Sequence, residues 1–139
     1  MIDCMVIGDS IAVGVHMART ECVRYAKSGI NSSQWNKDYL AQAITRPYET
    51  IIISLGANDT KNMPTDPELR KMRANIQGKR VFWISPGKER KPVAYDAIVR
   101  IAKEYGDVIL ERPKENMSGD GVHPTMKGYR ELAEKTKLR

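Results

Sequence analysis

The chain has 139 residues, of which 41% are hydrophobic and 29% charged, a balance typical of one globular domain with a hydrophobic core. Its apolar runs are shorter than the roughly 18 residues of a membrane-spanning helix, and two cysteines are too few for a disulfide framework. We therefore expect a single domain over residues 1–139 and no membrane span.

The start of the chain bears on where the protein works. The first predicted strand begins at residue 2, which leaves no room for the charged region and cleavage site of a secretory leader. We expect a cytoplasmic protein by default, or one that reaches a cell surface without a leader, for example on a phage particle. Cys4 and Cys22 are then expected to be reduced and structural, with a pair between neighbouring strands as the alternative.

The net charge of +6 is unevenly distributed. Residues 70–91 contain eight lysines and arginines and a single acid, Glu89, whereas the rest of the chain is close to neutral. Such a basic stretch suggests a polyanion nearby: nucleic acid, an anionic surface polymer or an acidic substrate. A solvated basic helix and loop would give the same composition, so both interpretations stay open.

Five strand-like runs alternate with five helix-like segments. The run at residues 50–55 is rich in β-branched residues and almost continuously apolar, which is typical of a strand buried on both faces. The predicted strands cover residues 2–8, 22–26, 50–55, 80–85 and 107–111.

Capping residues mark the helices between these strands. Ser32 or Ser33 can cap the helix after the second strand, and Asp66, followed by a proline at the first helical position, is typical of the start of the next. The fourth helix repeats apolar residues at helical spacing until Gly106, and Thr125 can cap the last helix.

Strict alternation of strands and helices predicts an α/β protein, a three-layer α/β/α sandwich with helices on both faces of a parallel sheet. Right-handed crossovers then give a doubly wound, five-stranded sheet in the order 2-1-3-4-5. Ligands bind such sheets beyond the carboxyl ends of the strands. Polar residues that follow the strands are therefore the candidates for a functional site.

Ser10 follows the first strand in the segment VIGDS. The strand ends at Gly8, and the chain turns sharply into a helix. Ser10 is thus expected at a helix N-terminus, where backbone N–H groups lack helical partners and the helix dipole favours negative charge. An ordinary N-cap is the alternative role of this serine.

Two further candidates follow the second and third strands. Gly29 lacks a Cβ, so the backbone there can approach a ligand closely, with a plain loop glycine as the alternative. Asn58 places a side-chain amide at a strand end, where it can donate to an oxyanion without carrying charge; an Asx turn is its alternative. The neighbouring Asp59 is expected to be a turn or cap residue.

Asp120 and His123 lie three residues apart in a glycine-rich segment after the fifth strand. This spacing lets the carboxylate bind the imidazole Nδ1, which leaves Nε2 free to accept a proton from a hydroxyl. His16, the other histidine, lies in the first predicted helix and is expected to be structural.

Together, four sequence blocks resemble those of the SGNH (GDSL-type) hydrolase family. They are the serine block at residues 8–14, Gly29, the Gly-x-Asn-Asp block at residues 56–59 and the Asp-x-x-His block at residues 120–123, in the expected order. The resemblance covers residues 6–125 and implies a flavodoxin-like domain that hydrolyses an ester, often of an acetyl or other short acyl group. The connections are shorter than is common in that family, which implies an open, shallow site.

The mechanism that this resemblance implies is acyl transfer to water through an acyl-enzyme. Ser10 is the nucleophile, His123 the general base and Asp120 the residue that orients the imidazole. The backbone N–H groups of Ser10 and Gly29 and the side-chain amide of Asn58 form the oxyanion hole. No cofactor and no metal ion are expected.

Fewer residues indicate the substrate. Trp83 at the end of the fourth strand, with Lys88 and Arg90 just after it, is expected at the edge of the site, and Trp35 is a further candidate. These residues suggest an acetylated, anionic glycan such as a cell-wall or capsular polymer, with a tryptophan as a sugar-stacking surface. Core packing is the alternative for both tryptophans.

Two other functions compete with hydrolysis. Residues 70–91 could bind nucleic acid, but their aromatic residues lie in a predicted strand and no nucleic-acid motif is present, so nucleic acid is not the expected partner. A catalytically inactive carbohydrate- or polyanion-binding module on the same fold would lack a nucleophile, base or oxyanion donor, and none is missing. The sequence therefore favours a serine ester hydrolase that acts on a small ester or an acylated glycan.

Overall fold

Strands and helices alternate along the chain as predicted. The computed structural model describes residues 3–137, and the predicted strand start at residue 2 lies outside this range. The strands are β1 (Cys4–Gly8), β2 (Val23–Ala26), β3 (Tyr48–Ser54), β4 (Gly78–Ser85) and β5 (Val108–Glu111). The helices are α1 (Ser10–Ala18), α2 (Ser32–Ala43), α3 (Thr65–Asn75), α4 (Pro92–Tyr105) and α5 (Met126–Lys135).

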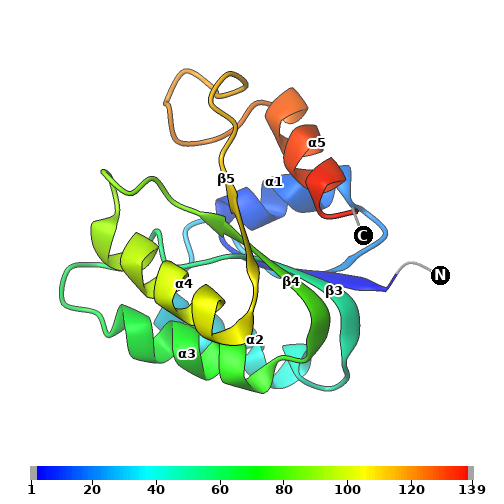
Figure 1. The fold of residues 1–139 in the computed structure, drawn as a ribbon, viewed down its shortest axis with the longest axis vertical. Coiled ribbons are helices and arrows are strands. Elements are labelled where there is room, and N and C mark those ends of the chain that lie inside the picture. Colours follow the sequence, from blue (N-terminus) through cyan, green and yellow to red (C-terminus); the bar gives the residue numbers. More distant parts are fainter. Residues whose placement is uncertain (1–2, 138–139) are drawn as a thin grey trace.

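The strands form one parallel sheet in the order β2-β1-β3-β4-β5, which confirms the predicted topology (Figure 1). β1 pairs with β2 on one side and β3 on the other, and Met5 lies opposite both Val23 and Ile51. Because all five strands run in the same direction, the loops that follow them gather at one edge of the sheet.

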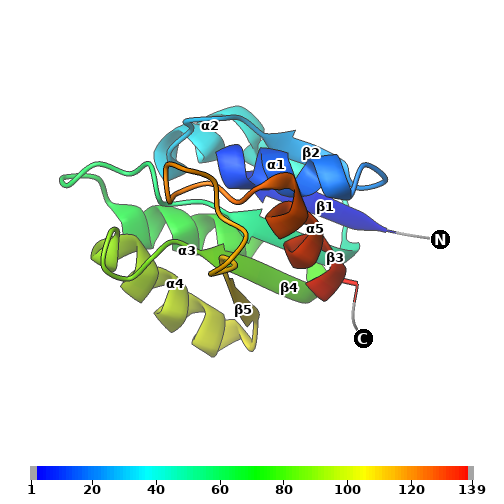
Figure 2. The same ribbon diagram turned by 90° about the horizontal axis from the view of Figure 1, so that it is seen from above.

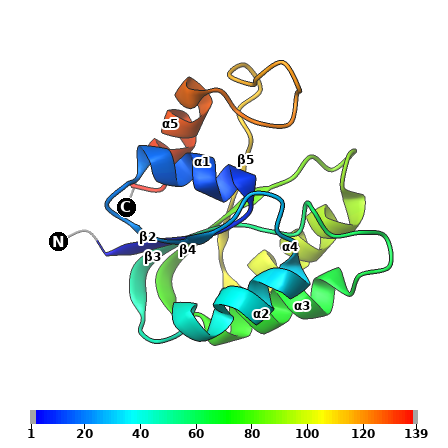
Figure 3. The same cartoon turned by 180° about the vertical axis from the view of Figure 1, so that it is seen from behind.

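Helices cover both faces of the sheet, so the predicted three-layer sandwich is confirmed. α1 and α5 lie on one face, and α2, α3 and α4 lie on the other (Figures 1, 2 and 3). Alternate residues of each strand face opposite layers: Met5 and Ile7 pack in the core under α2–α4, whereas Cys4 and Val6 pack under α1 and α5. Within residues 3–137, no helix has the length and apolar character needed to cross a membrane.

The cap of α2 differs from the prediction. Asn31 caps this helix, because its side chain accepts from a backbone N–H in the first turn. The two serines that were expected to cap it bind carboxylates instead: the Ser32 hydroxyl donates to Asp59, and the Ser33 hydroxyl donates to Glu68.

The start of α3 also differs from the prediction, whereas two other helix boundaries are confirmed. α3 begins at Thr65, so Asp66 lies within its first turn, where the carboxylate pairs with Arg70 and Arg100 and does not cap the helix. Gly106 ends α4 in the left-handed conformation with φ of +72°, and the Thr125 hydroxyl accepts from a backbone N–H at the start of α5.

Cys4 and Cys22 form a disulfide, so the expectation of two reduced cysteines is wrong. Cys4 is the first residue of β1, and Cys22 immediately precedes β2. The parallel register that pairs Met5 with Val23 therefore brings the two cysteines side by side, with their Cα atoms 4.7 Å apart. This register is a property of the folded sheet, which is why the sequence left the pairing open.

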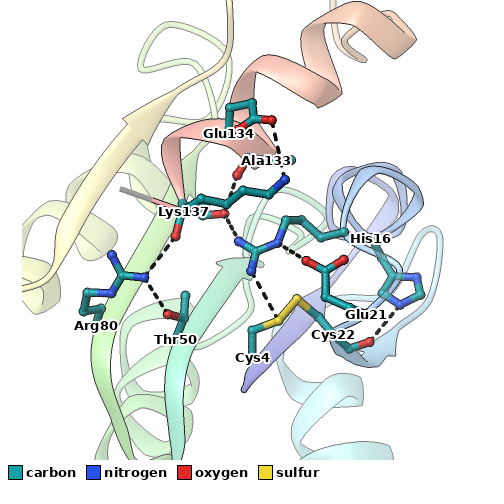
Figure 4. A network of polar contacts seen from close by, with 11 residues as sticks. Cys4, His16, Glu21, Cys22, Thr50, Arg80, Ala133, Glu134 and Lys137 are labelled. Atoms are coloured by element: carbon teal, nitrogen blue, oxygen red, sulfur yellow. Dashed lines mark hydrogen bonds and ion pairs between the residues drawn. A yellow bond between two sulfur atoms is a disulfide. The ribbon is translucent and has the colours of Figure 1, made fainter. Parts of the chain in front are cut away.

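Polar side chains surround the disulfide at the amino-terminal edge of the sheet (Figure 4). The buried Arg19 guanidinium donates to the Thr136 hydroxyl and to the sulfur of Cys4. His16 Nε2 lies 3.0 Å from the carbonyl oxygen of Cys22. These contacts join α1, β1 and the end of α5, and they place His16 in the structural role that was expected.

We predict that the disulfide stabilises the fold by about 3 kcal/mol, because it restricts the unfolded chain between two residues 18 positions apart. Urea unfolding with dithiothreitol present should show a correspondingly lower free energy of unfolding. The variant Cys4→Ala/Cys22→Ala is the control, since reductant has no disulfide to act on there. Identical wild-type midpoints with and without reductant would contradict the prediction.

Candidate active site

The turn between β1 and α1 fixes the position of Ser10. Gly8 ends β1 with φ of +132°, and a Cβ at this position would lie 1.7 Å from the carbonyl oxygen of Ser54 in β3, so the turn requires glycine. Asp9 then caps α1: its carboxylate accepts from the Ile11 N–H at 3.0 Å and from the Ser54 hydroxyl at 2.9 Å. Ser10 becomes the first residue of the helix, just beyond the carboxyl end of β1.

The Asp9 carboxylate is almost completely buried, and this burial raises its pKa. The hydrogen bonds from Ser54 and Ile11 and the positive charge of Arg112 act in the opposite direction. The residue before Ser10 is therefore held by the neighbouring strand, by its own helix and by the field of a cation that follows β5.

Ser10, His123 and Asp120 form a continuous chain of hydrogen bonds. His123 Nε2 lies 2.8 Å from Ser10 Oγ, and His123 Nδ1 lies 2.8 Å from Asp120 Oδ2. Ser10 and His123 are 113 positions apart in the sequence, so the fold itself brings them together. The three residues proposed from the sequence as nucleophile, base and orienting carboxylate are thus in contact.

Hydrogen bonds within the loop between β5 and α5 organise Asp120. Its Oδ1 accepts from the Ser118 hydroxyl and from the N–H groups of Val122 and His123, at 2.7–2.9 Å. The His123 N–H and imidazole, with the Ser118 hydroxyl and the Val122 N–H, hold the pKa of Asp120 far below its usual range. Arg112 Nη1 fixes the loop further by donating to the Val122 carbonyl at 2.9 Å.

Gly29 and Asn58 follow the two strands that flank β1. Gly29 is exposed with φ of +82°, and an added Cβ would meet no atom within 4 Å. Asn58 Nδ2 donates to the Ile30 carbonyl at 3.0 Å, which ties the loop after β3 to the loop after β2. An amide nitrogen carries two hydrogens, so one of them is left for a ligand. Asn58 is therefore a link between loops rather than a local Asx turn.

Asp59 has the structural role that its position suggested. Its carboxylate accepts from the Ser32 N–H at 2.7 Å and from the Thr65 hydroxyl at 2.8 Å. These bonds join the first turns of α2 and α3 beneath the loop that carries Asn58. Asp59 thus holds this part of the rim in place and is not in the chain of bonds to Ser10.

Neither tryptophan can form a sugar-stacking surface, so this expectation is wrong. The side chains of Trp35 and Trp83 are completely buried, in the core under α2–α4. Their indole N–H groups are also satisfied internally, by the Tyr25 carbonyl at 2.8 Å and by Asp107 Oδ2 at 2.9 Å. Both are core residues, the alternative that the sequence left open.

Lys88 and Arg90 line a groove of about 560 Å³ beside the loop between β5 and α5, which we call the basic groove. Its walls come from the ends of β4 and β5, from the loops that follow them and from Gly121. Two other lining residues, Arg112 and Tyr95, were missed from the sequence. Arg112 directly follows the fifth strand, a position that could have identified it, whereas no signal distinguishes Tyr95 from other residues of its helix.

One group among residues 3–137 has side chains of the types that bind metal ions: Cys4, Glu21 and Cys22, whose ligand atoms lie within 4.8 Å of one another. Both sulfurs belong to the disulfide, and Glu21 accepts from Arg19, so no thiolate is available (Figure 4). This group lies at the amino-terminal edge of the sheet, away from Ser10.

Comparison of the sequence with protein-family models and with curated proteins finds no match. Solved structures do match. The esterase EstA from a Pseudoalteromonas species has a TM-score of 0.66 at 15% identity, over 96% of this chain and 95% of that one. The catalytic domain of peptidoglycan O-acetyltransferase A from Streptococcus pneumoniae has a TM-score of 0.63 at 17% identity, over 96% of this chain and 89% of that one. The acetylxylan esterase Axe2 from Geobacillus stearothermophilus has a TM-score of 0.58 at 17% identity, over 94% of this chain and 90% of that one.

These likenesses extend over nearly the whole of each chain. At such low sequence identity they establish architecture. The chain has the fold of the SGNH (GDSL-type) hydrolases, as its four sequence blocks predict.

Proposed function

We propose that the protein is a serine ester hydrolase that removes acetyl or other short acyl groups from a carbohydrate. The observation that carries this proposal is the bonded chain from Ser10 Oγ through the His123 imidazole to Asp120, with both hydrogen bonds at 2.8 Å. A hydroxyl in this arrangement can be activated as a nucleophile.

The protonation of the site follows from Asp120. Because its pKa is far below the usual range, Asp120 is ionised at neutral pH and can only accept hydrogen bonds. His123 Nδ1 must therefore carry the proton in the bond to Asp120. The lone pair of Nε2 then faces Ser10 Oγ and can take its proton when the hydroxyl attacks an ester carbonyl.

The reaction proceeds in two halves. Ser10 Oγ bonds to the carbonyl carbon, and the imidazolium of His123 passes its proton to the departing alcohol, which leaves an acyl group on Ser10. Water then attacks this acyl group while His123 takes a proton from the water. His123 returns the proton to Ser10 Oγ as the bond between Oγ and the acyl carbon breaks and the carboxylic acid is released. Asp120 stabilises the imidazolium in both halves.

Three donors can stabilise the negative charge on the carbonyl oxygen. The N–H of Ser10 belongs to the first turn of α1, where the helix dipole favours an anion. The Gly29 N–H and the remaining Asn58 amide hydrogen come from the loops after β2 and β3, which the Asn58–Ile30 bond holds together. Uncharged donors fixed before the reaction suit this role.

The carbohydrate part of the proposal rests on the open site and on similar structures. Ser10 is half-buried rather than enclosed, so a bulky substrate can reach it. Similar structures include an acetylxylan esterase, a carbohydrate acetylesterase family member and a peptidoglycan O-acetyltransferase domain. The second candidate is a catalytically inactive glycan- or polyanion-binding module, which the basic groove favours.

Substitution of the nucleophile separates these two candidates. We expect Ser10→Ala to lower kcat on p-nitrophenyl acetate by at least about 10⁴-fold, because no other group can form the acyl-enzyme. A fluorophosphonate probe should label the wild type at Ser10 and leave Ser10→Ala unlabelled. Ser33→Ala, in α2, is the matched control and should keep both activity and labelling. Wild-type turnover in a correctly folded Ser10→Ala protein would rule the mechanism out.

The oxyanion donor has its own test. Asn58→Ala should lower kcat by roughly 10²–10³-fold, as measured for single side-chain donors of oxyanion holes. Asn62→Ala, in the exposed loop before α3, removes the same group type and should keep the wild-type kcat. Circular dichroism checks that both variants are folded. An unchanged kcat for Asn58→Ala would remove Asn58 from the oxyanion hole.

A further inference from the structure

The basic groove combines four cations with an aromatic ring. Lys88 and Arg90 enter it from the loop after β4, and Arg112 and Lys114 enter it from the segment after β5. The half-buried Tyr95 of α4 forms part of its wall, and Lys88 Nζ lies 5.9 Å from the centre of the Tyr95 ring.

No carboxylate in residues 3–137 forms an ion pair with any of these four cations. Glu89 and Glu111 also line the groove, so its lining keeps two positive charges in excess. Two buried arginines elsewhere are paired with carboxylates, Arg19 with Glu21 and Arg73 with Asp107, whereas the half-buried Arg80 bonds only to Thr50 and Thr136.

Arg112 is the least hydrated of the four cations. Its Nε is buried without a hydrogen-bond partner, and burial lowers the pKa of its guanidinium. Only its Nη1 has a protein partner, the Val122 carbonyl. A half-buried guanidinium without a carboxylate partner is stabilised when an oxyanion binds to it.

The basic groove adjoins the loop between β5 and α5, which carries His123. Gly121, two residues before His123, lines it, and the Arg90 guanidinium lies 3.2 Å from where a Gly121 Cβ would be. The proposed oxyanion donors follow β1, β2 and β3, whereas the groove lies beyond β4 and β5. Because His123 passes its proton to the departing alcohol, the alcohol part of the ester must lie on this side.

We propose that the basic groove is a subsite for oxyanion groups on the alcohol part of the substrate, so that the preferred substrate is an acylated acidic polysaccharide. The cations contact carboxylates or phosphates along the polymer, and the Tyr95 ring provides the surface for a sugar that the tryptophans cannot provide. This inference rests on the proposed ester hydrolysis and adds the charge of the substrate and the side on which it binds.

The test compares matched acetylated polymers. We expect the wild type to have a higher kcat/KM on acetylated polygalacturonate than on neutral acetylated xylan. Lys88→Gln and Arg90→Gln should each lower the ratio of these two constants about two- to fivefold, as for exposed ion pairs, and the double variant about tenfold. High salt should reduce the wild-type ratio in the same direction, because it screens exposed charges.

Controls separate the subsite from general charge effects. Lys37→Gln removes one exposed cation from α2 and should leave the ratio unchanged. An acetylated polyglycerol phosphate tests phosphate in place of carboxylate. The acidic polymer whose kcat/KM, relative to that of acetylated xylan, falls further in the double variant carries the preferred oxyanion. Arg112 is not substituted, because its bond to Val122 also holds the loop that carries His123.

The outcomes distinguish this inference from the proposed function. If both acidic polymers are hydrolysed but the double variant keeps the wild-type ratios, the subsite is wrong and the hydrolase stands. If no ester is hydrolysed and Ser10 is not labelled, the proposed hydrolase is wrong. Binding of unacetylated polygalacturonate to the wild type and the double variant then tests the subsite alone. Wild-type binding that the double variant loses supports the subsite, and equal or absent binding overturns it.

Discussion

The close approach of β1 to β3 at Gly8 is the constraint on which the site depends. Because Gly8 has no side chain, its backbone lies against the carbonyl of Ser54, and the Asp9 N–H donates to that oxygen at 2.8 Å. The hydroxyl of the same serine donates to the Asp9 carboxylate that caps α1. One residue of β3 thus fixes both the end of β1 and the start of the helix, and Ser10 has a single position relative to the sheet.

The position of His123 is fixed by a different contact, between α1 and α5, the two helices that cover one face of the sheet. A Cβ at Gly14 of α1 would lie 2.1 Å from the ring of Tyr129 in α5, so this glycine makes room for the tyrosine. α1 begins with Ser10, and α5 begins three residues after His123. The packing of these helices therefore sets the distance between hydroxyl and imidazole. The loop before α5 adds its own rigidity through the bonds to Asp120 and the Ser118 N–H bond to the His123 carbonyl.

The alternation of strands and helices and the three residues of the candidate triad could be predicted because their sequence signals are local, and the strand order followed from the general rule for doubly wound sheets. The serine motif is one continuous segment, and Asp120 and His123 are three residues apart. Pairings between segments could not be predicted: the disulfide depends on the register of β1 and β2, and the Asn58–Ile30 bond depends on two loop conformations. Trp83 is buried because helices cover both faces of the sheet: its neighbour Ile84, which packs in the opposite layer, is buried as well.

The basic stretch at residues 70–91 was identified from composition, which does not show where its side chains lie in the fold. Its eight cations do not form one surface, because residues 70–91 run through α3 and the whole of β4, from one edge of the sheet to the other. Arg70 and Arg73 of α3 are already paired with carboxylates, and Arg73 and its partner Asp107 are buried. A nucleic-acid strand needs a continuous cationic track, and this arrangement interrupts one. The charge available to a polyanion comes instead from residues 88–90 and 112–114, which are distant in sequence and meet beside the loop that carries His123.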